Sequence, residues 1–322
     1  MGAIQSLLDR DCRADADSLS ARLDEYRDRE QVVGPRPIDR EASQPAWNGS
    51  APVPEVDAGD FSGEVLLSAM ANSGCLIVRG FFDPGIAATF KPLIDKMLDV
   101  AYEEDPAGGD PVADTLNNPP EALSSLIPGN VWSNSRGFHR RSGSVMCVES
   151  SGICEHLIEL YEARGLKEII ANYLGEQPCL SALKWVLRRS KLPVNPAGWH
   201  QDGAFMGKEI NSLNMWLPLD HCGGDTGAPG MDILPVRLLD IVGAGEDDAA
   251  LSWSVGDGAV NQRYGEDMLV SPEFHPGDAF FFDHFLLHRT QYRESFERLR
   301  YAIETWFFGA GNFPKNQVPL SW

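Results

Sequence analysis

The second half of the chain is a series of short apolar or alternating segments, with turns between them and no helical pattern. From residue 178 onward these segments are LSALKWVLRR, SLNMWLPLD, MDILPV, DAFFFD, LLHRTQ and RYAIETWFF. Many short strands without intervening helices indicate an antiparallel sandwich, jelly roll or barrel. We therefore predict a mainly β fold with this region as its core.

A helical flank precedes the β region. Residues 73–82, SGCLIVRGFF, are a short apolar run bounded by glycines and predict a buried strand. Asp83 and Pro84 follow as a helix N-cap and first helical residue. Patterns at 153–164 and 166–174, each closed by a glycine, predict two further helices. The helix after Pro84 would face the core through Ile86, Phe90, Leu93, Ile94, Met97 and Leu98.

The N-terminal segment has weaker patterns. Residues 15–30 place Leu19, Leu23 and Tyr26 at helical spacing, which predicts a short amphipathic helix. Residues 34–60 are rich in Pro, Gly, Ser and Ala and lack periodicity, which is typical of an arm or linker.

A second irregular segment, residues 104–131, contains five prolines and predicts a long loop that could act as a lid. The predicted organisation is a helix and Pro/Gly-rich arm over 1–60, followed by a single domain over 61–322. Within that domain, 61–176 would supply a strand, the helical flank and the lid loop, and 177–322 the jelly-roll core. A chain of 322 residues is long enough for one large domain of this kind.

Composition excludes several classes of partner. The chain has 47 acidic and 27 basic residues and a net charge of −20, so nucleic acid and anionic membranes would repel it. No run reaches the apolar length of a transmembrane helix, and the start, MGAIQSLLDRDCRADAD, has the features of neither a signal peptide nor an anchor. Six cysteines without a C-x-x-C pair indicate reduced thiols. We expect a cytoplasmic protein.

GWHQDG, residues 198–203, places an imidazole and a carboxylate two residues apart, at His200 and Asp202. Alone, this pair is better explained by a hydrogen bond at a loop end. His288, in HPGDAFFFDHFLLHRT, adds a third candidate where a strand returns. Two histidines and one carboxylate form the facial triad of non-haem Fe(II) oxygenases, whose open positions suit a bidentate 2-oxo acid and O2. His284, on the same strand parity, is an alternative to His288.

A 2-oxo acid also needs a partner for its far carboxylate, and arginine pairs with carboxylates through two parallel hydrogen bonds. Arg298 and Arg300, in RLRYAIETWFF, lie on one face of the strand that follows His288. Thr290 would point to the same side as His288 and could add a hydroxyl hydrogen bond. These residues are candidates for binding the cosubstrate.

The combination of WHQDG, N-x-W-L-P-L-D, GD-x-x-x-FD-x-x-x-x-H-x-T and R-x-A-I resembles the phytanoyl-CoA dioxygenase family of Fe(II)/2-oxoglutarate oxygenases. With the opening GCLIVRGFFDP, the likeness spans residues 73–309. It implies a double-stranded β-helix of jelly-roll, cupin-like type. It also implies that His200, Asp202 and His288 bind the catalytic iron and that Arg300 binds 2-oxoglutarate. The R-x-A-I context favours Arg300 over Arg298, and the family match selects His288 over His284.

Two segments depart from the family pattern. The family often has P-G-S-H where this chain has LPVRLLD, residues 234–240, and its common H-G-S is here His288-Arg289-Thr290. Neither departure removes a ligand, and both fall in loops that shape the pocket. Related halogenases have a small residue in place of the carboxylate ligand, so the presence of Asp202 favours hydroxylation or a related oxidation.

Other polar and aromatic residues have weaker interpretations. Lys184 or Arg188 could assist cosubstrate or substrate binding, and because successive strand residues face opposite sides, at most one of Arg188 and Arg189 would point inward. Trp185, Trp199 and Trp216 could line the pocket, although aromatic residues on strands more often belong to the core. His221 and His275 are expected in turns. A basic cluster is better explained by a solvated or locally paired surface than by recognition of an anionic substrate group; it comprises Arg136, His139, Arg140 and Arg141.

These observations predict an Fe(II)/2-oxoglutarate-dependent dioxygenase that hydroxylates a small-molecule metabolite or natural-product intermediate and releases succinate and CO2. Desaturation, cyclisation or epimerisation would use the same residues. A non-catalytic, cupin-like metal- or ligand-binding protein is the alternative from another class. Arg300 argues against it, because a metal binder alone has no need for a residue that holds an oxo acid.

Overall fold

A computed structural model describes residues 12–25, 51–102, 129–194, 198–243, 245, 249 and 251–322. Almost all of the predicted lid loop, and the predicted arm up to residue 50, lie outside these residues. Tyr26 of the predicted N-terminal helix lies outside them as well.

The described part of the chain contains an eight-stranded sheet, the major sheet, with strand order β1-β2-β11-β6-β13-β4-β14 and β3 paired to β4. All its pairings are antiparallel except that of β1 with β2. Three strands from the N-terminal half, β1, β2 and β3, thus belong to a sheet whose other strands come from the C-terminal half. The strands are β1 (Glu55–Asp57), β2 (Cys75–Arg79), β3 (Ser144–Met146), β4 (Pro178–Arg189), β6 (Ser212–Pro218), β11 (Ala279–Phe282), β13 (Tyr301–Gly309) and β14 (Pro319–Ser321).

A smaller antiparallel sheet, the minor sheet, has the order β8-β12-β5-β9. Its strands are β5 (Trp199–His200), β8 (Met231–Ile233), β9 (Ser254–Val255) and β12 (His288–Thr290). A two-stranded ladder joins β7 (Cys222–Gly223) to β10 (Glu273–Phe274). Buried residues of both sheets form one apolar cluster, in which Trp216, Phe282 and Trp306 meet Met231 and Ile233. The predicted jelly-roll core is confirmed.

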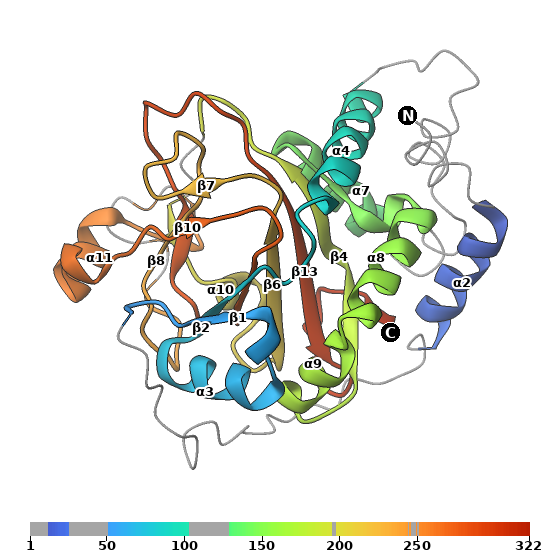
Figure 1. Ribbon diagram of the computed structural model, residues 1–322, viewed down its shortest axis with the longest axis horizontal. Helices are drawn as coiled ribbons and strands as arrows, with labels where there is room; N and C mark the ends of the chain where they lie inside the picture. Colours follow the sequence, from blue (N-terminus) through green and yellow to red (C-terminus); the bar gives the residue numbers. More distant parts are fainter. Residues whose placement is uncertain are drawn as a thin grey trace.

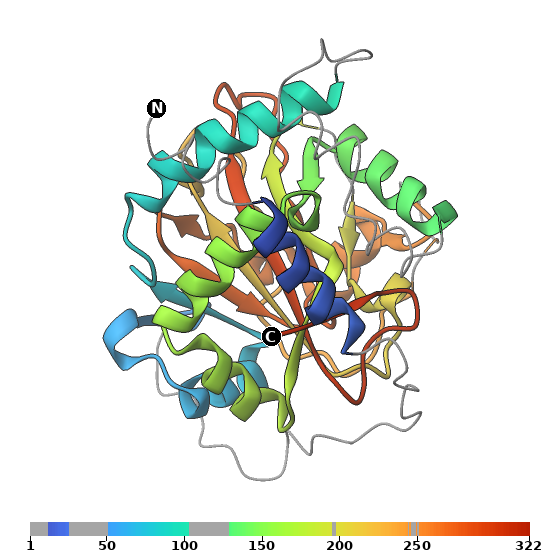
Figure 2. The same ribbon diagram turned by 90° about the vertical axis from the view of Figure 1, so that its right-hand side faces the viewer.

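Helices cover the outer face of the major sheet, as Figures 1 and 2 show. This layer contains α2 (Cys12–Asp24), α3 (Gly63–Ser73), α4 (Ile86–Tyr102), α7 (Gly129–Arg141), α8 (Ser151–Ala163) and α9 (Leu166–Leu174). Shorter helices are α10 (Gly203–Met206), α11 (Asp257–Tyr264), η1 (Ala58–Asp60), η2 (Cys147–Glu149) and η3 (Glu266–Met268). None of the helices among the described residues is long and apolar enough to cross a membrane.

The helix after β2 is confirmed, but α4 begins at Ile86 and not at the predicted Pro84, because residues 84 and 85 form a turn that leads into it. The Asp83 carboxylate accepts a hydrogen bond from the Gly85 amide at 2.6 Å, and the Asp83 carbonyl accepts one from Ile86. All six predicted core-facing residues of α4 are buried. The two later helices are also confirmed, and Gly165 and Gly175 after them adopt the left-handed conformation that glycine tolerates.

Three segments differ from the sequence prediction. The N-terminal helix ends at Asp24, and its Leu19 and Leu23 are buried in the cluster that includes α8. Residues 55–57, inside the predicted arm, form β1 and extend the major sheet. The polar helix α7 was not predicted, because GNVWSNSRGFHRR lacks a regular apolar stripe.

Candidate metal centre and its cavity

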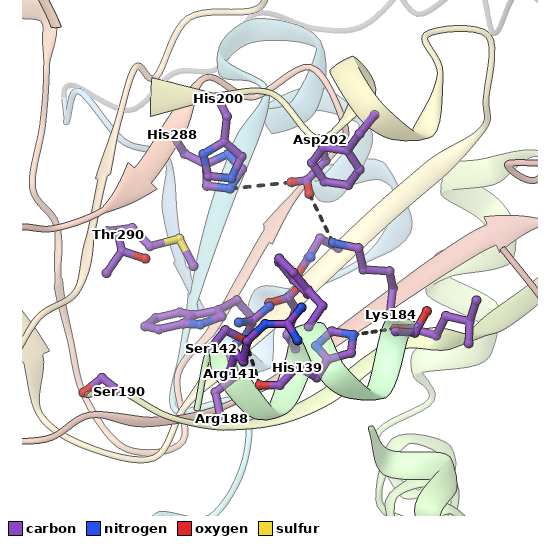
Figure 3. Close-up of a pocket in the computed structure, with 18 of the residues that line it drawn as sticks. His139, Arg141, Ser142, Lys184, Arg188, Ser190, His200, Asp202, His288 and Thr290 are labelled. Atoms are coloured by element: carbon purple, nitrogen blue, oxygen red, sulfur yellow. Dashed lines mark hydrogen bonds and ion pairs between the residues drawn. The ribbon is translucent and has the colours of Figure 1, made fainter. Parts of the chain in front are cut away.

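The three predicted metal ligands converge on one end of the minor sheet. His200 on β5 and His288 on β12 are directly opposite each other in the antiparallel ladder, with ring centroids 4.4 Å apart. Asp202 follows β5 at the start of α10, and its Oδ2 lies 3.6 Å from His288 Nε2 (Figure 3). One ligand atom from each residue can be chosen so that all three lie within 4.8 Å of one another.

Backbone contacts orient both imidazole rings. His200 Nδ1 lies 3.1 Å from the Gly198 carbonyl, and His288 Nδ1 lies 3.0 Å from the Leu286 carbonyl. A carbonyl oxygen only accepts, so each Nδ1 carries the proton and each Nε2 keeps its lone pair for a metal. Burial, and then the nearby His288, lower the pKa of His200, which favours the neutral, ligating form of the ring.

The local structure requires glycine at both glycine positions of GWHQDG. Gly198, whose carbonyl orients His200, has a φ of 76°, a conformation that side-chain-bearing residues rarely adopt. A Cβ on Gly203 would lie 2.6 Å from Ile241 Cδ1 and 3.1 Å from the His284 carbonyl oxygen. The Gly203 amide donates to that same carbonyl at 3.0 Å. Close backbone packing therefore fixes the position of Asp202.

Gln201, between the two ligands, is a supporting residue that sequence reasoning missed. Its buried amide donates to the carbonyls of Asp240, at 3.1 Å, and Phe285, at 2.7 Å. Its Oε1 accepts from the Val242 amide at 2.7 Å. The motif is thus tied to the segment before β12, and only the residue's place within the motif could have drawn attention to it.

His284, the alternative ligand, is held elsewhere. Its Nδ1 lies 2.7 Å from Ser212 Oγ and its Nε2 lies 3.1 Å from the Lys208 carbonyl. Both ring nitrogens therefore have hydrogen-bonding partners, and the residue is absent from the metal-ligand cluster found among the described residues. Between His284 and His288, the geometry favours His288 as the ligand.

A cavity of about 890 Å³ lies beside the triad. Of the seven residues predicted to bind the cosubstrate or substrate, five line it: Lys184, Arg188, Trp216, Thr290 and Arg300. Its wall also includes residues that sequence reasoning did not assign to a site, namely Phe138, Leu183, Phe205, Trp253, Phe282 and Glu304.

Arg300 is buried, and its guanidinium has no hydrogen-bond acceptor among the residues that the structure describes. The side chain is 6% exposed, and no described residue accepts a hydrogen bond from its Nε. The guanidinium carbon lies 5.3 Å from the centroid of the Trp216 ring, and Ser190 Oγ accepts from the Arg300 backbone amide at 2.8 Å. Buried polar groups normally have partners, so this arginine fits an anionic ligand in the cavity. Arg298, by contrast, is exposed and donates to the Thr226 carbonyl.

Lys184 and Arg188 extend from the cavity face of β4. Lys184 Nζ lies 3.8 Å from Asp202 Oδ1 and 4.5 Å from the centroid of the Phe205 ring. Arg188 Nε donates to Glu304 Oε2 at 2.7 Å. Burial raises the pKa of Glu304, but Arg188 and Lys184 outweigh it and bring the value to about 2. Arg189 pairs with Asp95 of α4, with its Nη1 2.6 Å from Asp95 Oδ1. Part of the residue still contributes to the cavity wall.

Two of the three tryptophans do not line this cavity, which corrects the prediction. Trp185 packs on the helix side of the major sheet, with its ring centroid 6.1 Å from that of Tyr161. Trp199 packs in a separate apolar cluster, and Arg289 lies over its ring at 4.6 Å. Each is adjacent in sequence to a cavity residue, so strand alternation turns it to the opposite face. Trp216 does line the cavity.

The basic cluster divides into residues with different surroundings. Arg136 and Arg140 pair with the buried Glu149 at 3.0 and 3.4 Å, as a locally paired surface predicts. His139 is buried in the cavity wall with its Nε2 3.0 Å from the Leu183 carbonyl. Burial, and then the positive charges of Arg188 and Lys184, lower the pKa of His139 to about 3. Arg141 lines the cavity.

The segments that depart from the family pattern have supporting contacts. Arg237, in LPVRLLD, donates to the buried Asp283 at 2.6 Å. Arg289 pairs with Asp232 at 2.8 Å and Asp257 at 2.6 Å. Both arginines thus stabilise the framework behind the triad.

His221 and His275 flank the β7–β10 ladder, with Glu273 between them. His221 Nε2 lies 2.5 Å from Glu273 Oε1, and the two rings stack with centroids 4.8 Å apart. All three side chains are exposed, so they form a surface cluster separate from the cavity.

Comparisons with known proteins establish the fold. No family model and no curated protein matches the chain. The structure of EctD from S. alaskensis with 2-oxoglutarate and 5-hydroxyectoine is similar at a TM-score of 0.50 and 18% identity, covering 89% of this chain and 83% of that one. The non-heme alpha ketoglutarate dependent carbocyclase SnoK from nogalamycin biosynthesis is similar at a TM-score of 0.51 and 13% identity, covering 79% and 87%.

These neighbours are phytanoyl-CoA-dioxygenase-like Fe(II)/2-oxoglutarate enzymes. At such low identity, the likeness defines the architecture of this chain alone. The chain has the double-stranded β-helix fold of the Fe(II)/2-oxoglutarate oxygenases, and it has a candidate His-Asp-His metal centre at one end of the minor sheet.

Proposed function

We propose that this protein is an Fe(II)/2-oxoglutarate-dependent dioxygenase that hydroxylates a small-molecule metabolite or natural-product intermediate. One observation carries the proposal: the same cavity is bordered by a metal-ligand triad and by a buried arginine whose Nε has no acceptor among the described residues. A protein that only held a metal would gain nothing from burying an unpaired guanidinium, because burying a charge without a partner is costly.

The donor set fits iron with an open coordination face. His200 and His288 would present Nε2, and Asp202 would present a carboxylate oxygen, which is the ligand set of non-haem Fe(II) oxygenases. When bound, iron and 2-oxoglutarate supply the oxidant from O2, with release of succinate and CO2. Lys184, whose Nζ lies 3.8 Å from Asp202 Oδ1, would help to hold this carboxylate in place.

The remaining residues would bind and orient the cosubstrate. Arg300 would pair with the far carboxylate of 2-oxoglutarate, and Thr290 would add a hydroxyl hydrogen bond. The Trp216 ring beneath the guanidinium limits the positions that Arg300 can take. Phe205 and Trp253 shield the approach to His200 from water, since the Trp253 ring lies 5.1 Å from the His200 ring and 5.5 Å from Phe205.

Hydroxylation is favoured over halogenation because the carboxylate ligand is retained in Asp202. Desaturation, cyclisation and epimerisation use the same cofactor-binding residues, and the position of the substrate relative to the metal decides among them. The mass of the product would identify the reaction: hydroxylation adds one oxygen atom, desaturation removes two hydrogens, and epimerisation leaves the mass unchanged.

An anaerobic titration tests the cofactor pair. Metal-free protein receives Fe(II) and then 2-oxoglutarate, and the visible charge-transfer band of the chelated oxo acid is recorded. We expect a band in the unchanged protein, none in His288→Ala, and a band that needs more 2-oxoglutarate in Arg300→Ala. His221→Ala, which removes an exposed histidine from the surface cluster, is the matched control and should keep the band. A folded, iron-loaded protein that gives no band would contradict the proposal.

A further inference from the structure

The charge of the cavity is opposite to that of the chain. Acidic residues outnumber basic ones by 47 to 27 over the whole sequence, yet the described lining residues include six cations and two carboxylates. The carboxylates are Asp202 and Glu304, and the cations are Arg141, Lys184, Arg188, Arg189, Lys191 and Arg300. Such a local reversal of charge concentrates anions in a cleft.

Three of these cations have roles already described. Arg300 would bind the cosubstrate, Lys184 lies beside Asp202, and Arg189 pairs with Asp95 of α4. Arg188 is different, because only its Nε contacts Glu304. The two terminal nitrogens of its guanidinium have no hydrogen-bond acceptor among the described residues, so they remain available to a ligand.

Arg141, the last residue of α7, is exposed and forms no ion pair with any described residue. Gly137, one turn earlier, leaves room for it, since a Cβ there would lie 3.2 Å from Arg141 Nη1. Figure 3 shows Arg141, with Arg188 and Ser142, on the side of the cavity away from the triad. Arg141 and Arg188 therefore point to a binding position at some distance from the metal.

The cavity wall also contains apolar and aromatic side chains. Trp253 lies next to His200 and Phe205 packs on Trp253, and Phe138 and Leu251 also line the cavity although they are 50% and 42% exposed. An exposed apolar side chain at the edge of a cavity is typical of a surface that a ligand covers.

We propose that Arg141 and Arg188 form an anion-binding subsite for the substrate. It would hold a carboxylate or phosphate group through the planar guanidinium forks, while the apolar body of the substrate lies against Phe205 and Trp253 beside the metal. The role in substrate recognition rests on the proposed oxygenase function, whereas the anion-binding property does not depend on it.

A matched pair of fluorescent probes tests the subsite without iron or O2. Anilinonaphthalene sulfonate is an aromatic anion, and phenylnaphthylamine is its analogue without the sulfonate. In Arg141→Gln, we expect the Kd of the anionic probe to rise about tenfold and that of the neutral probe to change less than twofold. Arg188→Lys keeps a positive charge beside Glu304 but removes the planar guanidinium, and it should also raise the Kd of the anionic probe. Trp253→Ala should weaken both probes.

Arg293 is an exposed arginine that pairs with Asp225. Its substitution, Arg293→Gln, is the control and should leave the affinities for both probes unchanged. If Arg141→Gln weakened the binding of both probes equally, the proposed subsite would be wrong. It would also be wrong if Arg300→Met weakened binding of the anionic probe while the Arg141 and Arg188 variants did not. Competition of phenylacetate and of phenyl phosphate with the anionic probe shows whether the subsite prefers a carboxylate or a phosphate. If neither compound displaced the probe, the proposal would also be wrong. The probes bind without iron, so this experiment tests the anion-binding subsite alone. The charge-transfer band tests the oxygenase function, and the two proposals can therefore fail independently.

Discussion

The two faces of strand β13 differ in chemistry. Ile303, Thr305 and Phe307 face the helix layer, where Ile303 and Phe307 belong to a large apolar cluster and Thr305 contacts the Tyr161 hydroxyl at 2.8 Å. Glu304, at an alternate position of the strand, and Arg300, directly before the strand, line the cavity. The helix face stabilises the fold by burying apolar area, whereas the cavity face buries charges that add little to stability and provide binding.

This division follows from the two-residue period of a strand. The same strand can contribute to a closed core on one side and to a site on the other, and hydrogen bonds to β4 and β6 hold both in register. Substitutions on the two faces should therefore have separable effects on stability and on binding.

The largest effect is expected on the helix face. Trp185→Ala should lower the free energy of unfolding by about 3–5 kcal/mol, because it leaves a cavity in a closed core. Trp253→Ala, on the partly exposed cavity wall, should cost less than about 1.5 kcal/mol. Urea unfolding of the two variants measures the difference, and equal losses would contradict the division between the faces.

A pH-dependent effect is expected from His139, in the cavity wall. Its pKa of about 3 in the folded protein lies below the ordinary value of 6.5, so the unfolded chain binds the proton more readily. This contribution to stability is complete above pH 6.5 and falls as the pH decreases toward 3, by about 3 kcal/mol at pH 4.5.

The comparison of the unchanged protein with His139→Gln by urea unfolding at pH 7 and pH 4.5 isolates this contribution. The variant should lose less stability than the unchanged protein over that interval. Glu304 should add its own loss only below about pH 4.5, since its pKa is lowered to about 2. Identical pH dependence in the two proteins would exclude a buried, neutral His139.

A smaller effect is expected at Gly203, beside the metal ligand Asp202. Gly203→Ala should cost about 1–2 kcal/mol, because its Cβ would approach both the Ile241 side chain and the His284 backbone. The displaced Asp202 should also weaken Fe(II) binding, which anaerobic titration measures. Gly258→Ala in α11, whose Cβ would meet no atom within 4 Å, is the control, and it should be neutral or slightly stabilising.

The smallest effect on stability is expected at Arg300. Arg300→Met should change the free energy of unfolding by less than about 1 kcal/mol, because it removes a buried charge whose Nε has no acceptor in the described part of the chain. The Kd for 2-oxoglutarate should nevertheless rise at least about tenfold. A large loss of stability with unchanged 2-oxoglutarate binding would reverse the roles of the two faces of β13.

The amino-acid sequence by itself determined the main strands of the jelly roll, the helices α4, α8 and α9, and the short-range motifs. Period-two alternation located the strands, and a capped stripe of apolar residues located α4, because these patterns depend on local geometry. The triad candidates could be named from GWHQDG and the strand that ends at His288, with the family resemblance deciding between His284 and His288.

Only the tertiary structure decided what surrounds those motifs. The pairing of β5 with β12 brings His200 next to His288, and strand alternation turns Trp185 and Trp199 away from the cavity. The separation of Arg141 from the paired Arg136 and Arg140 depends on Glu149, a residue from outside α7. Such contacts join positions far apart in the chain, so their free energy depends on packing and burial that no local pattern records.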